Sequence, residues 1–182
     1  PSILVEYSDI IQVFIPELKD TVIEQSIASI NRSLLNANIR MAILLKDIPN
    51  AKEILERLKY SGAEQTVILN CIKHSTKSLT SKIELKQFLS KLNIPFDIYH
   101  TYRYAIDTDY PRYNMLAYYH EIQDASEPYL LKHLAIDGNT IKGIGYQGKE
   151  IADVLHACLD EVIHHPENND AKILIDMIKR TD

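Results

Sequence analysis

Seven apolar side chains near the C-terminus recur at intervals of three and four residues, which is the spacing of one face of an α-helix. His164 and His165 follow the last of them, where a positive charge interacts favourably with the negative end of the helix dipole. Pro166 then ends the segment. The sequence therefore predicts one continuous helix from about Gly148 to His164. The apolar positions are Ile151, Val154, Leu155, Cys158, Leu159, Val162 and Ile163.

The remaining sequence also favours helices over strands. Only five of the 182 residues are glycine, fewer than the turns of a β-sandwich or a Rossmann-like sheet usually need. Thr21-x-x-Glu24 and Ser81-x-x-Glu84 have the pattern of a capping box, and residues 39–45 are almost wholly apolar, as in a central helix packed on all sides. We therefore expect an all-α fold of about ten helices, without a sheet.

Two packed helical units are expected, with a boundary in the acidic, proline-containing stretch 107–111. This division places residues 1–106 in a helical body and residues 107–182 in a helical tail. Within the body, the first capping box predicts a helix over 21–35. Gly62 follows another apolar helical face and suits its C-terminal cap.

Composition excludes several classes of protein. Charged residues make up 25% of the chain, and no apolar run approaches the ~20 residues of a membrane span. The N-terminus lacks the basic start and long apolar stretch of a signal peptide. Cys71 and Cys158 lie far apart in apolar runs, as buried reduced thiols do, so we expect a cytoplasmic protein. The chain begins with Pro1 and not with Met, which suggests a piece excised from a longer polypeptide.

Charge is unevenly distributed along the chain. The net charge is −5, so no overall positive charge indicates a nucleic-acid or anionic-membrane partner. Residues 32–103 nevertheless hold twelve basic and six acidic side chains, whereas residues 1–31 hold one and five, and residues 104–182 hold seven and fourteen. A basic stretch of this kind can bind phosphate, although such stretches on helices are more often simply solvated.

A segment in this basic region reads R-M-A-I-L-L-K-D-I-P from Arg40 and ends R-L-K-Y-S at Ser61. It resembles the body of class II CCA-adding tRNA nucleotidyltransferases and their poly(A) polymerase relatives, which is itself related to the His-Asp metal phosphohydrolases. Lys46 stands where those hydrolases have a metal-binding histidine. An ammonium group has no lone pair for a metal ion and repels it, so we expect no metal here. Lys46 and Asp47 suit an interhelical salt bridge or a capped turn.

A second segment resembles the tail of the same family. The run L-A-I-D-G-N-T-I extends from Leu134 to Ile141, and G-Y-Q-G-K-E-I from Gly145 leads into the long helix. Asn168 then precedes the last expected helix. The order of these parts follows the family pattern, which has an aspartate, a leucine and two prolines at four positions that differ here. These positions are Thr140, Ile141, Gln147 and Lys149.

The glycines before the long helix also have a physical meaning of their own. Gly145 and Gly148 let another backbone approach closely, and N–H groups at the positive end of a helix dipole favour a phosphate. Lys149 adds a positive charge there. Two glycines can also serve a tight turn alone, but the two family segments in their expected order favour contact with an RNA backbone. The candidate RNA-binding residues are Asn139, Gly145, Gly148, Lys149, Arg103 and Arg112.

Aromatic residues form a third cluster, interleaved with Arg103 and Arg112. Tyrosine and arginine side chains can stack on bases. In a chain with no tryptophan and only three phenylalanines, however, we expect the tyrosines to fill the core, and the two arginines to be available to an RNA backbone. The tyrosines of this cluster are Tyr99, Tyr102, Tyr104, Tyr110, Tyr113, Tyr118 and Tyr119.

The resemblance implies the C-terminal body and tail of a CCA-adding enzyme, which hold the acceptor stem and elbow of tRNA. Nucleotide addition would belong to an N-terminal head that this chain lacks, and that head would bind Mg²⁺ and CTP or ATP. Asp107-Thr108-Asp109 is the only D-x-D here, and it lacks the turn and strand that such a catalytic site needs. The expected partners are therefore tRNA and the head, with no catalytic residue, metal or cofactor in this chain.

Two alternatives belong to other functional classes. A degenerate His-Asp enzyme using Asp47 and His74 predicts a bound divalent metal. A helical protein-interaction module predicts an exposed apolar groove and no affinity for tRNA.

Overall fold

The computed structural model describes residues 2–181, and all regular structure among them is helical. These residues form twelve α-helices and two short 3₁₀ turns, with no strand or sheet, and the chain is 69% helical. The all-α fold predicted from the sequence is confirmed. No helix within the described range is both long and apolar enough to cross a membrane.

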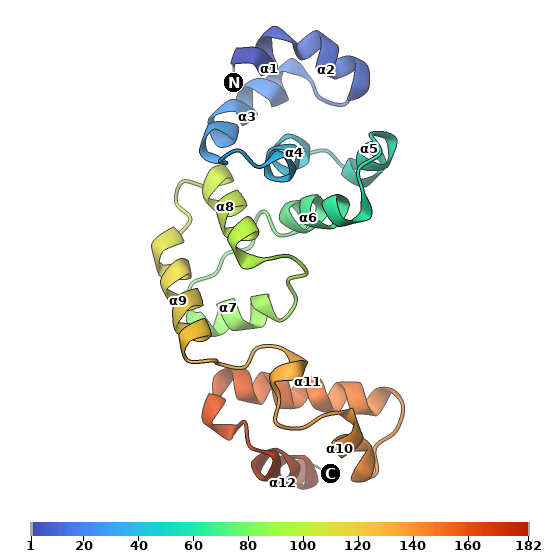
Figure 1. The fold of residues 1–182 in the computed structure, drawn as a ribbon, viewed down its shortest axis with the longest axis vertical. Helices are drawn as coiled ribbons and strands as arrows, with labels where there is room; N and C mark the ends of the chain where they lie inside the picture. Colours follow the sequence, from blue (N-terminus) through green and yellow to red (C-terminus); the bar gives the residue numbers. More distant parts are fainter. Residues whose placement is uncertain (1, 182) are drawn as a thin grey trace. The chain divides into compact units, whose positions relative to one another are not determined.

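The chain forms two compact units, and each of them contains two separate stretches of the sequence (Figure 1). The first unit contains the residues up to Ser78 together with Leu92–Arg112, and the second contains Leu79–Lys91 together with the residues from Tyr113 onward. The sequence-based division at 106/107 differs from this one. It placed residues 79–91 in the body, whereas the structure places them in the second unit, so the chain passes between the units three times.

The first unit is organised around one central helix. Helix α4 packs against α3, α6 and α8, and its buried side chains are those of the apolar run predicted from the sequence. The prediction of a helix packed on several sides is therefore confirmed. The helices of this unit are α1 (Ser2–Glu6), α2 (Ser8–Phe14), α3 (Asp20–Arg32), α4 (Ala37–Leu45), α5 (Ala51–Arg57), α6 (Gly62–Lys73) and α8 (Phe96–Ile106).

Helix α6 begins at a capping box that we did not predict. The Ser61 hydroxyl accepts the N–H of Glu64, and the Glu64 carboxylate accepts the N–H of Ser61 at 2.9 Å. These two bonds satisfy donors that have no partner within the helix. Gly62 is therefore the first residue of α6, and the prediction that it caps the preceding helix is wrong.

The preceding helix, α5, ends at Arg57, and Lys59 follows its C-cap residue Leu58. The backbone of Lys59 has a φ of 61°, in the left-handed region. The Lys59 N–H donates to the carbonyl of Glu56, and the Tyr60 N–H donates to the carbonyl of Leu55. This pair of bonds is a Schellman motif, in which glycine is the usual left-handed residue. Lys59 thus has the role that the sequence suggested for Gly62.

The two predicted capping boxes have different outcomes. Helix α3 begins at Asp20 without a side-chain cap, so Thr21 lies inside the helix and the first box is wrong. At α7 (Lys82–Leu89), the Ser81 hydroxyl accepts the N–H of Glu84 as predicted. The Glu84 carboxylate, however, accepts the N–H of Thr80 at 2.7 Å and not that of Ser81.

The second unit is organised around α11, which runs unbroken over Lys149–His164 and confirms the helix predicted from the apolar spacing. It packs against α7, α10 and both 3₁₀ turns. Figure 1 shows α10, α11 and α12 following one another in the C-terminal part of the chain. The other elements are α9 (Arg112–Asp124), η1 (Leu131–His133), α10 (Gly138–Gly143), η2 (Pro166–Asn168) and α12 (Ala171–Thr181).

The core of the second unit joins α10, α11 and α12. Its buried members are Ile136, Ile141, Cys158, Val162, Leu174 and Ile178. Cys158 is thus a free, buried thiol, as is Cys71 in the first unit, where burial raises the pKa of the thiol to about 12. The burial predicted for both cysteines is confirmed.

A buried lysine fixes α7 in the second unit. Lys86 is 1% exposed, and its Nζ donates to Glu127 Oε2 at 3.0 Å and to the carbonyl oxygen of Ile163 at 2.9 Å. Lys82 Nζ donates to the other oxygen of Glu127 at 2.7 Å. Burial alone would raise the pKa of Glu127, but the hydrogen bonds from Lys82 and Lys86 outweigh it and the pKa is lowered.

We predict that Glu127→Gln destabilises the second unit by about 3 kcal/mol, because it leaves the buried ammonium of Lys86 without its counter-charge. Lys82→Met removes the more exposed partner of the same carboxylate and should cost only about 1 kcal/mol or less. Urea unfolding of the two variants measures the difference. Equal losses would show that the burial of Lys86 does not determine the strength of this pair.

The lowered pKa of Glu127 also predicts a dependence of stability on pH. A depressed carboxyl pKa contributes stability that is complete above the ordinary value of 4.5 and is lost as the pH falls through the lowered pKa. The parent chain should therefore lose stability between pH 5 and pH 3, and Glu127→Gln should lose less over the same interval. Melting temperatures across this range test the expectation, and parallel curves would contradict it.

Candidate nucleic-acid interface

The stretch 137–149, from the start of α10 to the first residue of α11, contains four of the six predicted RNA-binding residues. Asp137 begins it by capping α10, where its carboxylate accepts the N–H and the hydroxyl of Thr140, both at 2.9 Å. These bonds lower the pKa of Asp137. Asn139 is the second residue of α10 and is exposed. The D-G-N-T run is therefore a helix start.

Two glycines shape the turn that follows. Gly145 has a φ of +116° and Gly148 a φ of +56°, which are values that side chains with a Cβ rarely adopt. A Cβ added at either position would meet nothing within 4 Å. Glycine is thus required here by the backbone conformation, and the turn faces open space that another molecule can enter.

Lys149 is the exposed first residue of α11, and no side chain caps the helix at Gly148. The positive end of a sixteen-residue helix dipole therefore lies beside an exposed lysine. The negative charge of Glu150 opposes this positive charge. Its carboxylate lies near the turn, where it accepts the N–H of Gln147 at 3.3 Å. Gly145, Gly148 and Lys149 lie close together because they are neighbours in the sequence, and the local net charge is small.

Arg103 does not offer its guanidinium on a surface. It is 6% exposed, and its Nη2 donates to Asp107 Oδ2 at 2.8 Å while the group lies 5.3 Å from the centre of the Tyr110 ring. The predicted availability of Arg103 to an RNA backbone conflicts with this burial. The helical spacing of four residues between Arg103 and Asp107 is the signal that could have indicated the pairing.

Arg112 is half-buried and its guanidinium lies 4.2 Å from the centre of the Tyr104 ring. Both residues belong to the first unit, whereas the glycine turn belongs to the second. Three of the seven clustered tyrosines are buried as expected: Tyr99, Tyr102 and Tyr110. Tyr113 is 72% exposed and the other three are half-buried, so the expected core role holds for only part of the cluster.

Half of the basic side chains in the middle of the sequence are paired. Among the described residues, six of its twelve basic side chains form salt bridges with carboxylates. The unit boundaries also divide the stretch between the two units. The paired residues are Lys46, Lys52, Arg57, Lys82, Lys86 and Arg103.

Lys46 forms a salt bridge with the adjacent Asp47, and not the interhelical one that was expected. The side chain of Asp47 is 71% exposed. His74 ends α6, and burial together with Lys73 and Lys77 lowers its pKa. Within residues 2–181, no three His, Cys, Asp or Glu side chains are grouped as a metal site requires.

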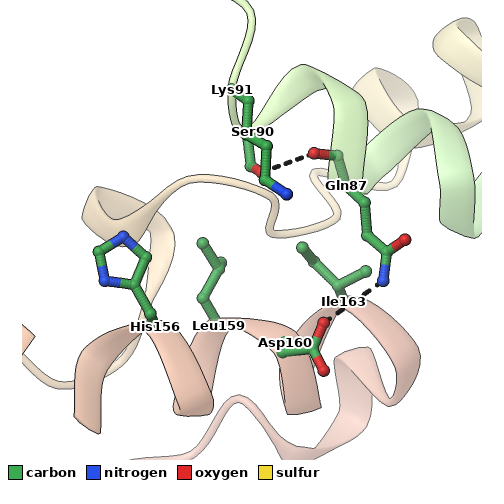
Figure 2. A pocket seen from close by; sticks show the side chains of 7 residues that line it. All are labelled: Gln87, Ser90, Lys91, His156, Leu159, Asp160 and Ile163. Carbon is green, nitrogen blue, oxygen red and sulfur yellow. Dashed lines mark hydrogen bonds between the residues drawn. The ribbon is translucent and has the colours of Figure 1, made fainter. Parts of the chain in front are cut away.

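A pocket between α7 and α11 was not predicted from the sequence. Figure 2 shows side chains of α7 and of the residues just after it on one side of the pocket, and side chains of α11 on the other. Its volume is about 290 Å³, and its lining combines apolar and polar side chains. Sequence reasoning missed it because residues 79–91 were placed in the other unit. The lining residues are Gln87, Ser90, Lys91, His156, Leu159, Asp160 and Ile163.

Comparisons of this chain with protein family models, with curated proteins and with solved structures give no match.

The glycine requirement can be tested by substitution. We predict that Gly148→Ala destabilises the protein by roughly 1–3 kcal/mol, because alanine is strained at a φ of +56°. Gly143→Ala is the matched control, since Gly143 lies in α10 without a positive φ or a neighbour within 4 Å. It should be neutral or slightly stabilising. Urea unfolding compares the two, and equal stabilities would contradict the strained geometry.

Proposed function

We propose that this chain is the tRNA-binding C-terminal portion of a class II CCA-adding tRNA nucleotidyltransferase. It would hold the acceptor stem and elbow of tRNA in the cytoplasm, while a head elsewhere in the polypeptide uses Mg²⁺ and CTP or ATP to add nucleotides. The observation that carries this proposal is the exposed glycine turn at the uncapped start of α11, with Lys149 beside it. That arrangement suits a phosphate of an RNA backbone.

The chemistry of the turn supports backbone contact without base selection. Two glycines leave room for a phosphate oxygen to approach main-chain N–H groups, and Lys149 supplies a charge that also attracts it. Glu150 reduces the local charge, so one turn of this kind binds weakly. Contacts of this type fix position on an RNA and carry no sequence information.

The sequence resemblance supports the same proposal through the placement of its segments. The body-like segment from Arg40 lies in α4 and α5 of the first unit, and the tail-like segment from Leu134 forms α10 and the start of α11 in the second. Lys46, in place of the metal-binding histidine, is paired with Asp47. This pairing favours a scaffold role for the segment over hydrolysis.

A second candidate function, protein interaction, is favoured by α1 and α2. Helix α2 has no buried residue, and large apolar side chains are exposed along both helices. In the proposed enzyme, the catalytic head would be the protein that covers this surface. A chain that serves protein interaction alone would leave tRNA unshifted in a gel at any salt concentration. The exposed apolar residues are Ile3, Val5, Tyr7, Ile10, Val13 and Phe14.

We predict that Lys149→Glu weakens tRNA binding roughly tenfold at 50 mM salt, since one charge-assisted phosphate contact becomes a repulsion. The slope of log affinity against log salt should decrease by about one unit. Folding should be preserved, because glutamate is favourable in the first turn of a helix. Gel shifts at several salt concentrations measure both quantities.

Lys172→Glu is the matched control. Lys172 is an exposed lysine in the first turn of α12, in the same unit, so the two variants have the same charge. It should bind tRNA within about twofold of the parent chain if the effect depends on position. Equal losses in the two variants would show that only net charge matters, and unchanged binding by Lys149→Glu would remove the phosphate assignment.

A further inference from the structure

The pocket between α7 and α11 has no role in the function proposed above. It lies within the second unit, where Lys86 fixes α7 beside the end of α11. Leu159 and Ile163 are buried and form its apolar floor. Polar side chains from both helices surround that floor: Gln87, Ser90, Lys91, His156 and Asp160. An apolar floor with a few polar groups at its edge suits a flat, polar-edged ligand.

The polar groups have defined hydrogen-bonding roles. Gln87 Nε2 donates to Asp160 Oδ1 at 3.3 Å, and among the described residues no contact occupies Oδ2. His156 Nδ1 lies 2.7 Å from the carbonyl oxygen of Ala152, so Nδ1 carries the proton. Lys91 is exposed and forms no salt bridge within residues 2–181. The pocket thus offers a carboxylate acceptor and an ammonium donor at its edge.

We infer that this pocket binds an unpaired guanine base. Guanine has two adjacent donors, N1–H and the N2 amino group, which match the two oxygens of the Asp160 carboxylate. Oδ1 has a second lone pair beside the one that Gln87 occupies, so it can accept one of these donors. It also has O6 and N7 as acceptors for the ammonium of Lys91. Each other base places an acceptor beside its donor on that edge, and the carboxylate repels it. Leu159 and Ile163 would contact the face of the base. The imidazole ring of His156 would lie beside the base and stack against it.

The proposed RNA contact at the glycine turn lies on the same face of α11. Lys149, His156 and Asp160 are at positions i, i+7 and i+11, which align on one side of a helix. Lys149 and His156 are about 10.5 Å apart along the axis at 1.5 Å per residue. One RNA strand can reach both, so the inference that RNA supplies the guanine rests on the proposed function.

Asp160→Asn tests the recognition chemistry. The amide presents one donor and one acceptor, so it no longer matches the two donors of guanine. The full 182-residue chain is titrated with dye-labelled single-stranded oligonucleotides that differ only in a central guanine or adenine. The parent chain should prefer guanine about tenfold, and Asp160→Asn should abolish that preference.

Asp153→Asn is the matched control, because Asp153 is an exposed aspartate of α11 outside the pocket. It should retain the preference for guanine. Lys91→Ala should weaken binding of the guanine oligonucleotide severalfold without affecting folding, since Lys91 is exposed. A parent chain without preference, or an Asp160→Asn variant that keeps it, overturns the proposal.

Competition with GMP and AMP distinguishes the source of the base. If GMP displaces the labelled oligonucleotide at the same concentration as the unlabelled oligonucleotide does, the ligand is a free guanine nucleotide. If only the unlabelled oligonucleotide displaces it, the ligand is RNA. Both results support recognition of guanine. Guanine preference without tRNA binding would remove the proposed function and leave the pocket, whereas tRNA binding that depends on Lys149, with no preference for guanine, would remove the pocket and leave the proposed function.

Discussion

The burial of Lys86 is the interaction on which the second unit depends. A lysine ammonium is costly to remove from water unless a counter-charge and hydrogen-bond acceptors replace the solvent. Glu127 supplies the charge, and the carbonyl of Ile163 supplies an acceptor from the last turn of α11. That carbonyl has no partner within its own helix, so the lysine satisfies it as well. One side chain thereby joins three parts of the chain that are distant in sequence.

This interaction explains why α7 belongs to the second unit, although in the sequence it lies between α6 and α8 of the first unit. Residues 79–91 bring Lys86 to Glu127 and Ile163, and the same placement brings Gln87 close to Asp160. The groove between the helices is a consequence of that packing. Without α7, the floor formed by Leu159 and Ile163 would be an exposed apolar surface of α11, and no pocket would exist.

The sequence allowed the prediction of features that depend on local spacing. The length of α11 and the cap at Ser81 follow from side chains three to four residues apart. The placement of α7 and the burial of Arg103 depend on tertiary packing, which periodicity does not report. Gly62 shows a local ambiguity: glycine suits both the end of one helix and the start of the next, and Lys59 at a φ of 61° decided the outcome.

The electrostatics of the candidate interface follow from how this chain distributes charge. Half of its basic middle region is paired with carboxylates, so a broad cationic surface is not what would attract a polyanion. The glycine turn instead offers main-chain N–H groups, a helix dipole and Lys149, with Glu150 opposing them. Such a site attracts a phosphate only at short range, because its dipole falls off within the first turn. Recognition by this chain would therefore depend on a partner whose shape brings a phosphate to the turn, as a folded RNA does and a random polyanion does not.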